Sequence, residues 1–242
     1  SFGLGAITHA QTPPKVVEPK TLEELDKALA KVVADAKVPG MGVAVIEGGA
    51  VVFTKGYGFA DAAAKTPVTE NTRFRAGSIS KVFIGLSAMA LVEEGKLSLD
   101  TPMAELAPEV PVRNPFGQDA PLRLVHLLEH TSGWADYTLK QFATHGRGMR
   151  LADAVLKDSP YTVRYAPGLY YAYANPGSAA AALMVERASG TPYYDFVKSR
   201  WFEPLGMASA TFDKPVRDLA VSYLADRKTS AGYMELSARA VG

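Results

Sequence analysis

The chain has 242 residues, which suits one large domain or two small ones, and 48% of them are apolar against 21% charged, so a substantial core can be buried. With 26 basic and 25 acidic residues the net charge is +1 and no basic stripe stands out, which argues against nucleic acid as a partner. No apolar run reaches the length of a membrane span, and the lack of cysteine excludes disulfides, thiolate metal sites and a cysteine nucleophile.

The first ten residues, SFGLGAITHA, are small and apolar and include no acidic residue. A polar, proline-rich stretch with the composition of a linker, QTPPKVVEPK, follows them. Because Thr8-His9-Ala10 resembles the small-x-small end of a signal peptide, residues 1–20 are predicted to be a leader remnant and linker. This interpretation implies a periplasmic or secreted protein, and the alternative is an ordinary flexible N-terminus.

The first regular elements are a helix and a hairpin. Thr21 can cap a helix, with Glu24 completing a capping box, and apolar residues at helical spacing continue to a stop before Pro39-Gly40. Two strand-like runs, 41–47 and 50–58, are joined by Gly48-Gly49, which is a strong two-residue hairpin signal. Residues 59–73 are expected to form a loop.

The rest of the chain is predicted to be largely helical. The helix that stops near Gly95 is apolar in all directions, which is typical of a helix buried on every side. A two-stranded ribbon is only marginally stable alone, so further strands are expected from beyond Gly242, from another chain, or from strands without a clear pattern. The helical stretches are expected at about 79–94, 121–130, 178–188 and 192–202.

Lys81 is the one charged residue in the apolar run from Ile79 to Val92. A buried ammonium acquires partners or loses its proton, unless the side chain reaches solvent from the helix end. Ser78, three residues earlier, shares a helix face with Lys81. A serine here can be an N-cap. It can also be a nucleophile that the lysine activates, with helix N-terminal amides stabilising an oxyanion.

The segment Tyr173-Ala174-Asn175 is a second candidate part of the same site. In an extended segment, residues i and i+2 point to the same side, so a phenol and an amide would face one site together. A nearby ammonium would favour the phenolate of Tyr173 and make it a competent base. The structural alternatives are an ordinary aromatic in a tyrosine-rich run and an Asn175 N-cap followed by Pro176 at the first helical position.

Taken together, these residues and their surroundings resemble the serine β-lactamase and penicillin-binding-protein superfamily. The similarity is to its class C-like branch, which also holds D-stereospecific peptidases and carboxylesterases. It runs from about Leu22 to Tyr223 and includes the hairpin ahead of the serine. The remaining motifs are FRAGSISKVF (74–83), LLEHTSG (127–133), YAPGLYYAYANPG (165–177), SGTPYYDFV (189–197) and FEPLGMASATF (202–212).

The resemblance implies a role for each candidate residue. Ser78 would attack a carbonyl and become acylated, and its own amide would give one half of the oxyanion hole. Lys81 would hydrogen-bond Ser78 and help to activate it. Tyr173 would act as general base on attack and as general acid toward the leaving group. Asn175 would orient the substrate's amide side chain or hold Lys81. Whether Lys81 or Tyr173 takes the first proton stays open.

One departure from the family concerns its third motif, in which Lys or His precedes Thr or Ser and then Gly on a late strand. The nearest string here is Lys228-Thr229-Ser230, which lacks the glycine and falls in a polar stretch. The chain therefore resembles an N-terminal portion of the family, which a separate C-terminal fragment could complete.

Other chemistries have little support. The histidines after the leader, His126, His130 and His145, form no metal-binding H-E-x-x-H, and for His130 a core or capping role is expected. No G-x-S-x-G elbow, P-loop or dinucleotide-binding glycine pattern is present. Two alternatives to an enzyme remain: a sensor that is acylated without turnover, and a non-catalytic binding domain of the same fold.

The predicted fold class is α/β (α+β), β-lactamase/transpeptidase-like, with an antiparallel sheet flanked by helices and a mostly helical region beside it. The sheet is expected to lack its C-terminal part. The α/β part should cover about 21–96 and 203–242, and the helical part about 97–202. The expected partner is a small-molecule or peptidoglycan-like substrate, either a β-lactam, an ester or a D-amino-acid peptide. No cofactor or metal is implied.

Overall fold

The computed structural model describes residues 18–117, 119–138, 141, 149–157, 159–213 and 217–224. These residues divide into two compact units. The N-terminal unit holds the chain up to Thr72 together with residues 223–224, and the helical unit runs from Arg73 to Ser222. Ser78 and its helix therefore belong with the helical unit, whereas the sequence pattern grouped residues 21–96 with the sheet. The predicted leader remnant, residues 1–17 of it, lies outside the described residues.

The N-terminal unit begins with α1 (Leu22–Asp35), which ends before Pro39 as predicted. Thr21 is its N-cap, and the Thr21 hydroxyl accepts the Glu24 N–H at 3.1 Å. The returning bond of the capping box differs from the prediction, because the Glu24 carboxylate accepts the N–H of Lys20 at 2.7 Å rather than that of Thr21. The cap still satisfies amides that a helix N-terminus leaves without partners.

The predicted hairpin is confirmed. Strands β1 (Gly40–Glu47) and β2 (Ala50–Asp61) pair antiparallel. Gly48 and Gly49 join them with φ of 57° and 81°. Positive φ at both turn positions matches the twist of the strands, and glycine adopts it at low cost.

The loop expected at 59–73 is partly wrong. Strand β2 continues to Asp61, and a two-residue strand, β3 (Thr66–Pro67), pairs antiparallel with its end. The sheet order is β1-β2-β3 among the described residues. A strand of two residues is too short to leave an alternating pattern in the sequence.

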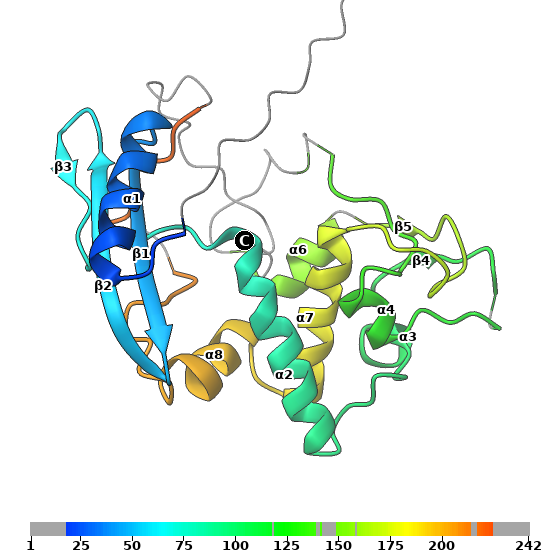
Figure 1. Cartoon of the computed structure of the whole chain (residues 1–242). Coiled ribbons are helices and arrows are strands. Elements are labelled where there is room, and N and C mark those ends of the chain that lie inside the picture. Colours follow the sequence, from blue (N-terminus) through cyan, green and yellow to red (C-terminus); the bar gives the residue numbers. More distant parts are fainter. Residues whose placement is uncertain are drawn as a thin grey trace, which may run out of the picture. The chain divides into compact units, whose positions relative to one another are not determined.

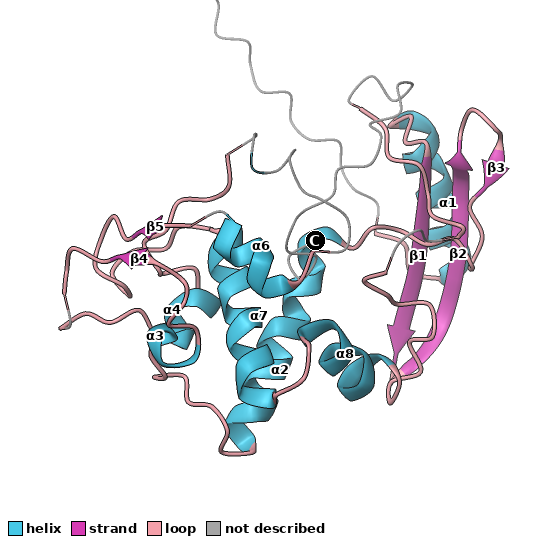
Figure 2. Cartoon of the chain, turned by 180° about the vertical axis from the view of Figure 1, so that it is seen from behind, coloured by secondary structure: helices cyan, strands magenta, loops and turns pink. Residues whose placement is uncertain are grey.

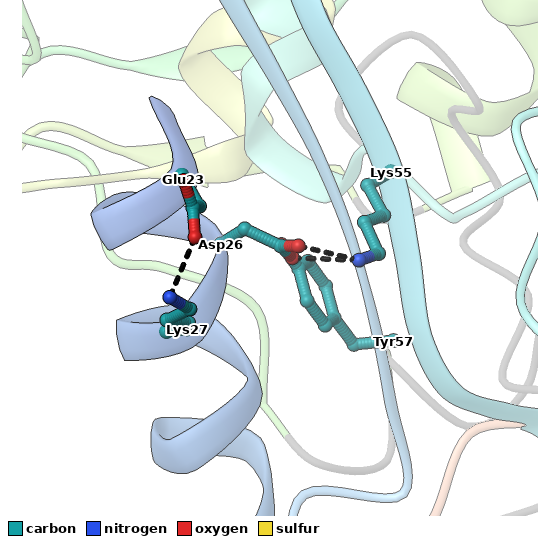
Figure 3. Close-up of polar contacts among 5 residues, drawn as sticks. All are labelled: Glu23, Asp26, Lys27, Lys55 and Tyr57. Carbon is teal, nitrogen blue, oxygen red and sulfur yellow. Dashed lines mark hydrogen bonds and ion pairs between the residues drawn. The ribbon is translucent and has the colours of Figure 1, made fainter. Parts of the chain in front are cut away.

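Helix α1 lies on one face of the hairpin, in front of the strands in Figure 1 and behind them in Figure 2. One carboxylate joins the two layers. Asp26 accepts the Tyr57 hydroxyl at 2.8 Å and the Lys55 ammonium at 2.7 Å, so two side chains from one face of β2 converge on α1 (Figure 3). On the exposed side of α1, Lys27 pairs only within the helix, with Glu23.

The helical unit is built around α2 (Lys81–Glu93) and α7 (Asn175–Ser189), which lie side by side in both views (Figures 1 and 2). Residues 179–182 of α7 are four alanines with no exposed surface. Alanine carries only a Cβ, so neighbouring helices can approach the α7 backbone closely. Around this pair the unit has α3 (Met103–Leu106), α4 (Leu124–Leu128), α6 (Leu151–Lys157), α8 (Tyr193–Val197), a π-helix (Lys198–Phe202), and the short parallel pair β4 (Val112–Arg113) and β5 (Tyr161–Thr162).

Three predicted helices need adjusted bounds. The stretch 121–130 shortens to α4, and 192–202 becomes α8 followed by the π-helix. The stretch 178–188 is longer, because α7 starts at Asn175. Its predicted stop is confirmed, since Gly190 closes the helix in the left-handed conformation with φ of 69°.

The prediction that α2 is buried on every side is wrong. Its inner face packs in the core through residues such as Ile84 and Leu91, which are 1% and 0% exposed. The opposite stripe, Val82, Leu86 and Met89, is 57%, 40% and 43% exposed. These positions recur at helical spacing, so they form one continuous apolar stripe. None of the described helices is long and apolar enough to cross a membrane.

The contact between Tyr57 and Asp26 predicts alkaline sensitivity. Burial, with the adjacent Asp26 carboxylate, raises the pKa of Tyr57 to about 12, whereas an unfolded tyrosine has a pKa of about 10. The unfolded chain therefore releases this proton first, and the Tyr57 contribution to the free energy of unfolding is present below pH 10 and is lost between pH 10 and 12. We expect Tyr57→Phe to lose less stability than the wild type over this range in urea titrations. Equal losses would contradict the assignment.

Candidate active site

Ser78 lies in a short 3₁₀ helix, Gly77–Ser80, that leads directly into α2. The N-cap position of this 3₁₀ helix is taken by Ala76, not by a serine. The Ser78 Oγ atom instead accepts a hydrogen bond from Lys81 Nζ at 2.9 Å and shares another with Tyr173 Oη at 2.8 Å. The hydroxyl is therefore engaged by two side chains that can take or give protons.

Lys81 is the first residue of α2 and is partly buried. Its ammonium lies 5.2 Å from the centre of the Tyr173 ring, a cation–π distance. One turn of helix separates Lys81 from Ser78, so the backbone itself brings the two side chains together. The alternative in which Lys81 only extends to solvent does not describe this geometry, because Nζ points to the Ser78 hydroxyl.

Tyr173 precedes α7 in an extended segment that His130 holds from one side. The carbonyl of His130 accepts the N–H of Ala172 at 2.8 Å, and His130 Nδ1 accepts the N–H of Ala174 at 3.2 Å. The rings of His130 and Tyr173 lie 4.4 Å apart at a 35° tilt. His130 has φ of 59°, in the left-handed region, where histidine, asparagine and aspartate are enriched among residues other than glycine. It thus fixes both the backbone and the ring of Tyr173.

Asn175 is not the helix N-cap that the structural alternative required. It is the first residue of α7, Ala174 occupies the cap position without a side-chain bond, and Pro176 follows at the second helical position. The Asn175 amide is buried, with 6% of the residue exposed. Its Nδ2 donates to both carboxylate oxygens of Asp136 at 3.0 and 3.2 Å, and its Oδ1 accepts from Tyr173 Oη at 3.3 Å. As predicted, the Tyr173 and Asn175 side chains share one side of the chain.

The structure thus brings all four candidate residues into one connected group within the helical unit. Ser78 and Lys81 come from the start of α2, and Tyr173 and Asn175 come from the start of α7. The Ser78 hydroxyl therefore has two side chains in hydrogen-bond contact, an amine and a phenol, and either can act as a base when it is deprotonated. The string Lys228-Thr229-Ser230, considered for the third motif, lies outside the described residues.

Sequence reasoning did not single out Asp136, and it did not predict that His130 positions Tyr173. Both follow the short helix α4, and the only local signal is the run HTSGWAD, which has no periodic pattern. Each reaches the site by contacts across more than thirty-five residues of chain, a separation that local patterns do not reveal. Among the described residues, no group of three or more His, Asp or Glu side chains is placed to hold a metal ion.

The comparisons with known proteins agree with this picture. Esterase EstB of Burkholderia gladioli is 28% identical over 199 residues, which cover 78% of this chain and 50% of the esterase. The octameric penicillin-binding protein homologue from Pyrococcus abyssi is 30% identical with a TM-score of 0.73, covering 86% of this chain and 49% of that one. A class C beta-lactamase structure is 26% identical with a TM-score of 0.72, covering 90% of this chain and 59% of that one.

These similarities show that the chain has the β-lactamase/transpeptidase-like fold of serine hydrolases, as the sequence predicted. The family model named Beta-lactamase matches residues 25–234, so the chain belongs to the beta-lactamase family. It spans about half the length of the relatives that it matches.

The surroundings of His130 predict acid sensitivity. Burial lowers the pKa of His130, and the nearby positive charge of Lys81 lowers the pKa further. An unfolded histidine has a pKa of about 6.5, so the unfolded chain takes up this proton first on acidification. The His130 contribution is therefore fully present above pH 6.5 and is lost as pH falls below that value.

The variant His130→Asn tests this assignment. Asparagine tolerates the left-handed conformation and keeps an acceptor for the Ala174 N–H, but it does not titrate. We expect it to lose less stability than the wild type between pH 7 and 5 in urea titrations. His126, whose pKa is lowered mainly by burial, should make a separate contribution, so His126→Asn should add to the effect. An unchanged pH dependence in His130→Asn would show that this ring does not resist protonation.

Proposed function

We propose that the chain carries the nucleophilic half of a serine hydrolase site that acts through an acyl-enzyme. The observation that supports this most is the position of the Ser78 hydroxyl, 2.9 Å from the Lys81 ammonium and 2.8 Å from the Tyr173 phenol. A serine hydroxyl is a weak nucleophile that requires an adjacent base. Proton transfer from a positioned side chain typically contributes about a hundredfold to ten-thousandfold in rate.

The proposed reaction has two steps. In the first, Ser78 Oγ forms a bond to the carbonyl carbon and its proton passes to the deprotonated member of the Tyr173–Lys81 pair. The bond from carbon to the leaving oxygen or nitrogen then breaks as that atom receives the proton from the same pair. In the second, water attacks the acyl group and releases Ser78. The N–H of Ser78 would supply one half of the oxyanion hole. Asn175 would hold the Tyr173 side chain in place, because its Oδ1 accepts a hydrogen bond from the Tyr173 hydroxyl.

The substrate class proposed is a carboxylic ester, a β-lactam or a D-amino-acid peptide, each of which presents a carbonyl to the serine. The names of two relatives, an esterase and a class C beta-lactamase, fall within this range. Because one fold hosts several such chemistries, substrate preference must come from side chains around the nucleophile rather than from the serine itself.

The replacement Ser78→Ala tests the nucleophile. We expect it to abolish labelling by a fluorophosphonate and to lower p-nitrophenyl butyrate turnover on the order of a thousandfold or more, because no other group can form the acyl bond. Mass spectrometry of the labelled chain measures the adduct and its position. Ser199→Ala is the matched control, since that hydroxyl only donates to helix carbonyls, and it should label like the wild type. A labelled Ser78→Ala chain would rule out this nucleophile.

The same measurement separates turnover from sensing. After exposure to benzylpenicillin, an enzyme should lose its acyl adduct with time, whereas a sensor should keep it. Persistence of the adduct over hours would replace the hydrolase proposal with acylated sensing at the same serine.

We also propose that a further segment, from beyond Gly242 or from another chain, completes the sheet of the N-terminal unit. Among the described residues β1 pairs only with β2, so its other edge has no described strand beside it, and a strand edge of this kind favours the addition of another strand.

Hydrogen exchange tests this completion. In the 242-residue chain alone, the β1 amides that do not bond to β2 should exchange rapidly, and in the chain that includes the completing segment they should be protected at least tenfold. Equal protection in the two forms would show that β1 needs no further strand.

A further inference from the structure

Tyr171 is an exposed tyrosine two residues before Tyr173, and the site described above gives it no role. It is 70% exposed. A single exposed aromatic side chain is ordinary on a protein surface, so only its position relative to the candidate catalytic residues can give it a function. An aromatic ring beside a nucleophile offers a large apolar area for contact with a substrate.

The backbone places Tyr171 on the same side of the chain as Tyr173. The N–H groups of Ala172 and Ala174 both donate to His130, as alternate residues along one edge of an extended segment do. Ala174 is fully buried, whereas Tyr171 and Tyr173 are exposed. The side chains of Tyr171 and Tyr173 therefore leave the segment on one side, with their attachment points about 7 Å apart.

One imidazole ring contacts both tyrosines. The centre of the His130 ring lies 4.4 Å from that of Tyr173 and 6.0 Å from that of Tyr171, the latter edge to face at 84°. Burial, and then the positive charge of Lys81, lower the pKa of His130, so its ring is uncharged at neutral pH. The three rings thus form one aromatic cluster. At its Tyr173 end the phenol oxygen lies 2.8 Å from Ser78 Oγ.

The proposed reaction determines which part of the substrate meets this cluster. The leaving atom receives its proton from the Tyr173–Lys81 pair, so the leaving group must lie beside Tyr173 when its bond to carbon breaks. Tyr171 is the next side chain on the same side of the segment. A substituent that extends from the leaving atom along this segment therefore reaches the ring of Tyr171.

We infer that Tyr171 is a specificity-determining residue that contacts the leaving group and favours esters of aromatic alcohols. An aromatic substituent can pack against the Tyr171 ring in an edge-to-face or offset arrangement, whereas a short alkyl group leaves most of that ring in water. The inference deepens the proposed function and rests on it, because it concerns substrates of the same serine.

A purely structural role makes a different prediction. If Tyr171 only supports the His130 ring, its loss disturbs Tyr173 whichever ester is bound, and turnover of all esters falls equally. The matched control is Tyr170, which is also an exposed tyrosine. Its ring contact is with Tyr165, at 5.4 Å between ring centres.

The experiment measures kcat/KM of the full chain for benzyl butyrate and for ethyl butyrate, by titration of the butyric acid released. The two esters share the acyl group and differ in the alcohol. We expect Tyr171→Ala to lower the selectivity for the benzyl ester over the ethyl ester about tenfold, because the lost ring contact serves one substrate only. Tyr171→Phe keeps the ring and should keep the selectivity. Tyr170→Ala should have the selectivity of the wild type.

The outcomes separate the two proposals. If a fluorophosphonate labels Ser78 but Tyr171→Ala lowers both kcat/KM values equally, the inference fails while the proposed function stands. The same conclusion follows if the labelled wild type does not prefer the benzyl ester or hydrolyses neither ester. An equal loss of selectivity in Tyr170→Ala also overturns the inference, because the effect would not be particular to Tyr171. If Ser78 of the wild type takes no label, the proposed function fails and the inference falls with it.

Discussion

The close packing of α2 against α7 is the constraint on which the site depends. Residues 179–182 of α7 are alanines without exposed surface, and they let the facing helices approach the α7 backbone. The two helices carry the candidate catalytic side chains at their starts, so their contact decides whether Ser78 meets Tyr173. Rigid helices position such groups better than loops do, because each side chain inherits the order of a packed backbone.

Around this contact, hydrogen bonds from polar side chains fix orientations that apolar packing alone does not fix. His130 brackets the Tyr173 segment with two hydrogen bonds and a ring contact, and Asp136 holds Asn175 with three hydrogen bonds. A buried amide that is satisfied at both ends has one orientation, whereas a partly satisfied amide can reverse. The Asn175 amide therefore has a defined orientation as well as a defined position.

The N-terminal unit uses a similar device for a different purpose. Asp26 joins α1 to β2 by accepting from Lys55 and Tyr57, and the hydrogen bonds from Lys55 and then Tyr57 hold the pKa of Asp26 below its usual value. Here the acceptor fastens a helix to a sheet face, and no nucleophile is involved. In both units a single carboxylate gathers donors from a separate element, which is how an acceptor-only group links segments that are distant in sequence.

Local sequence determined the parts of the structure that local physics controls. The cap at Thr21, the paired glycines of the hairpin and the stop at Gly190 each reflect the conformational preference of a few adjacent residues. Ser78 and Lys81 could be paired from their spacing, since one helical turn brings them together whatever the rest of the chain does. The pairing of Tyr173 with Asn175 followed from strand geometry in the same way.

Only the tertiary structure decided which segments distant in the sequence contact one another. It joined the Ser78 turn to Tyr173 across 95 residues, brought Asn175 into contact with Asp136, and left a stripe of α2 exposed that its composition predicted to be buried. Each of these depends on which surfaces meet after folding, and no local propensity contains that information. The candidate nucleophile and its lysine were thus readable from the sequence, whereas their contacts with Tyr173, Asn175 and Asp136 required the packed fold.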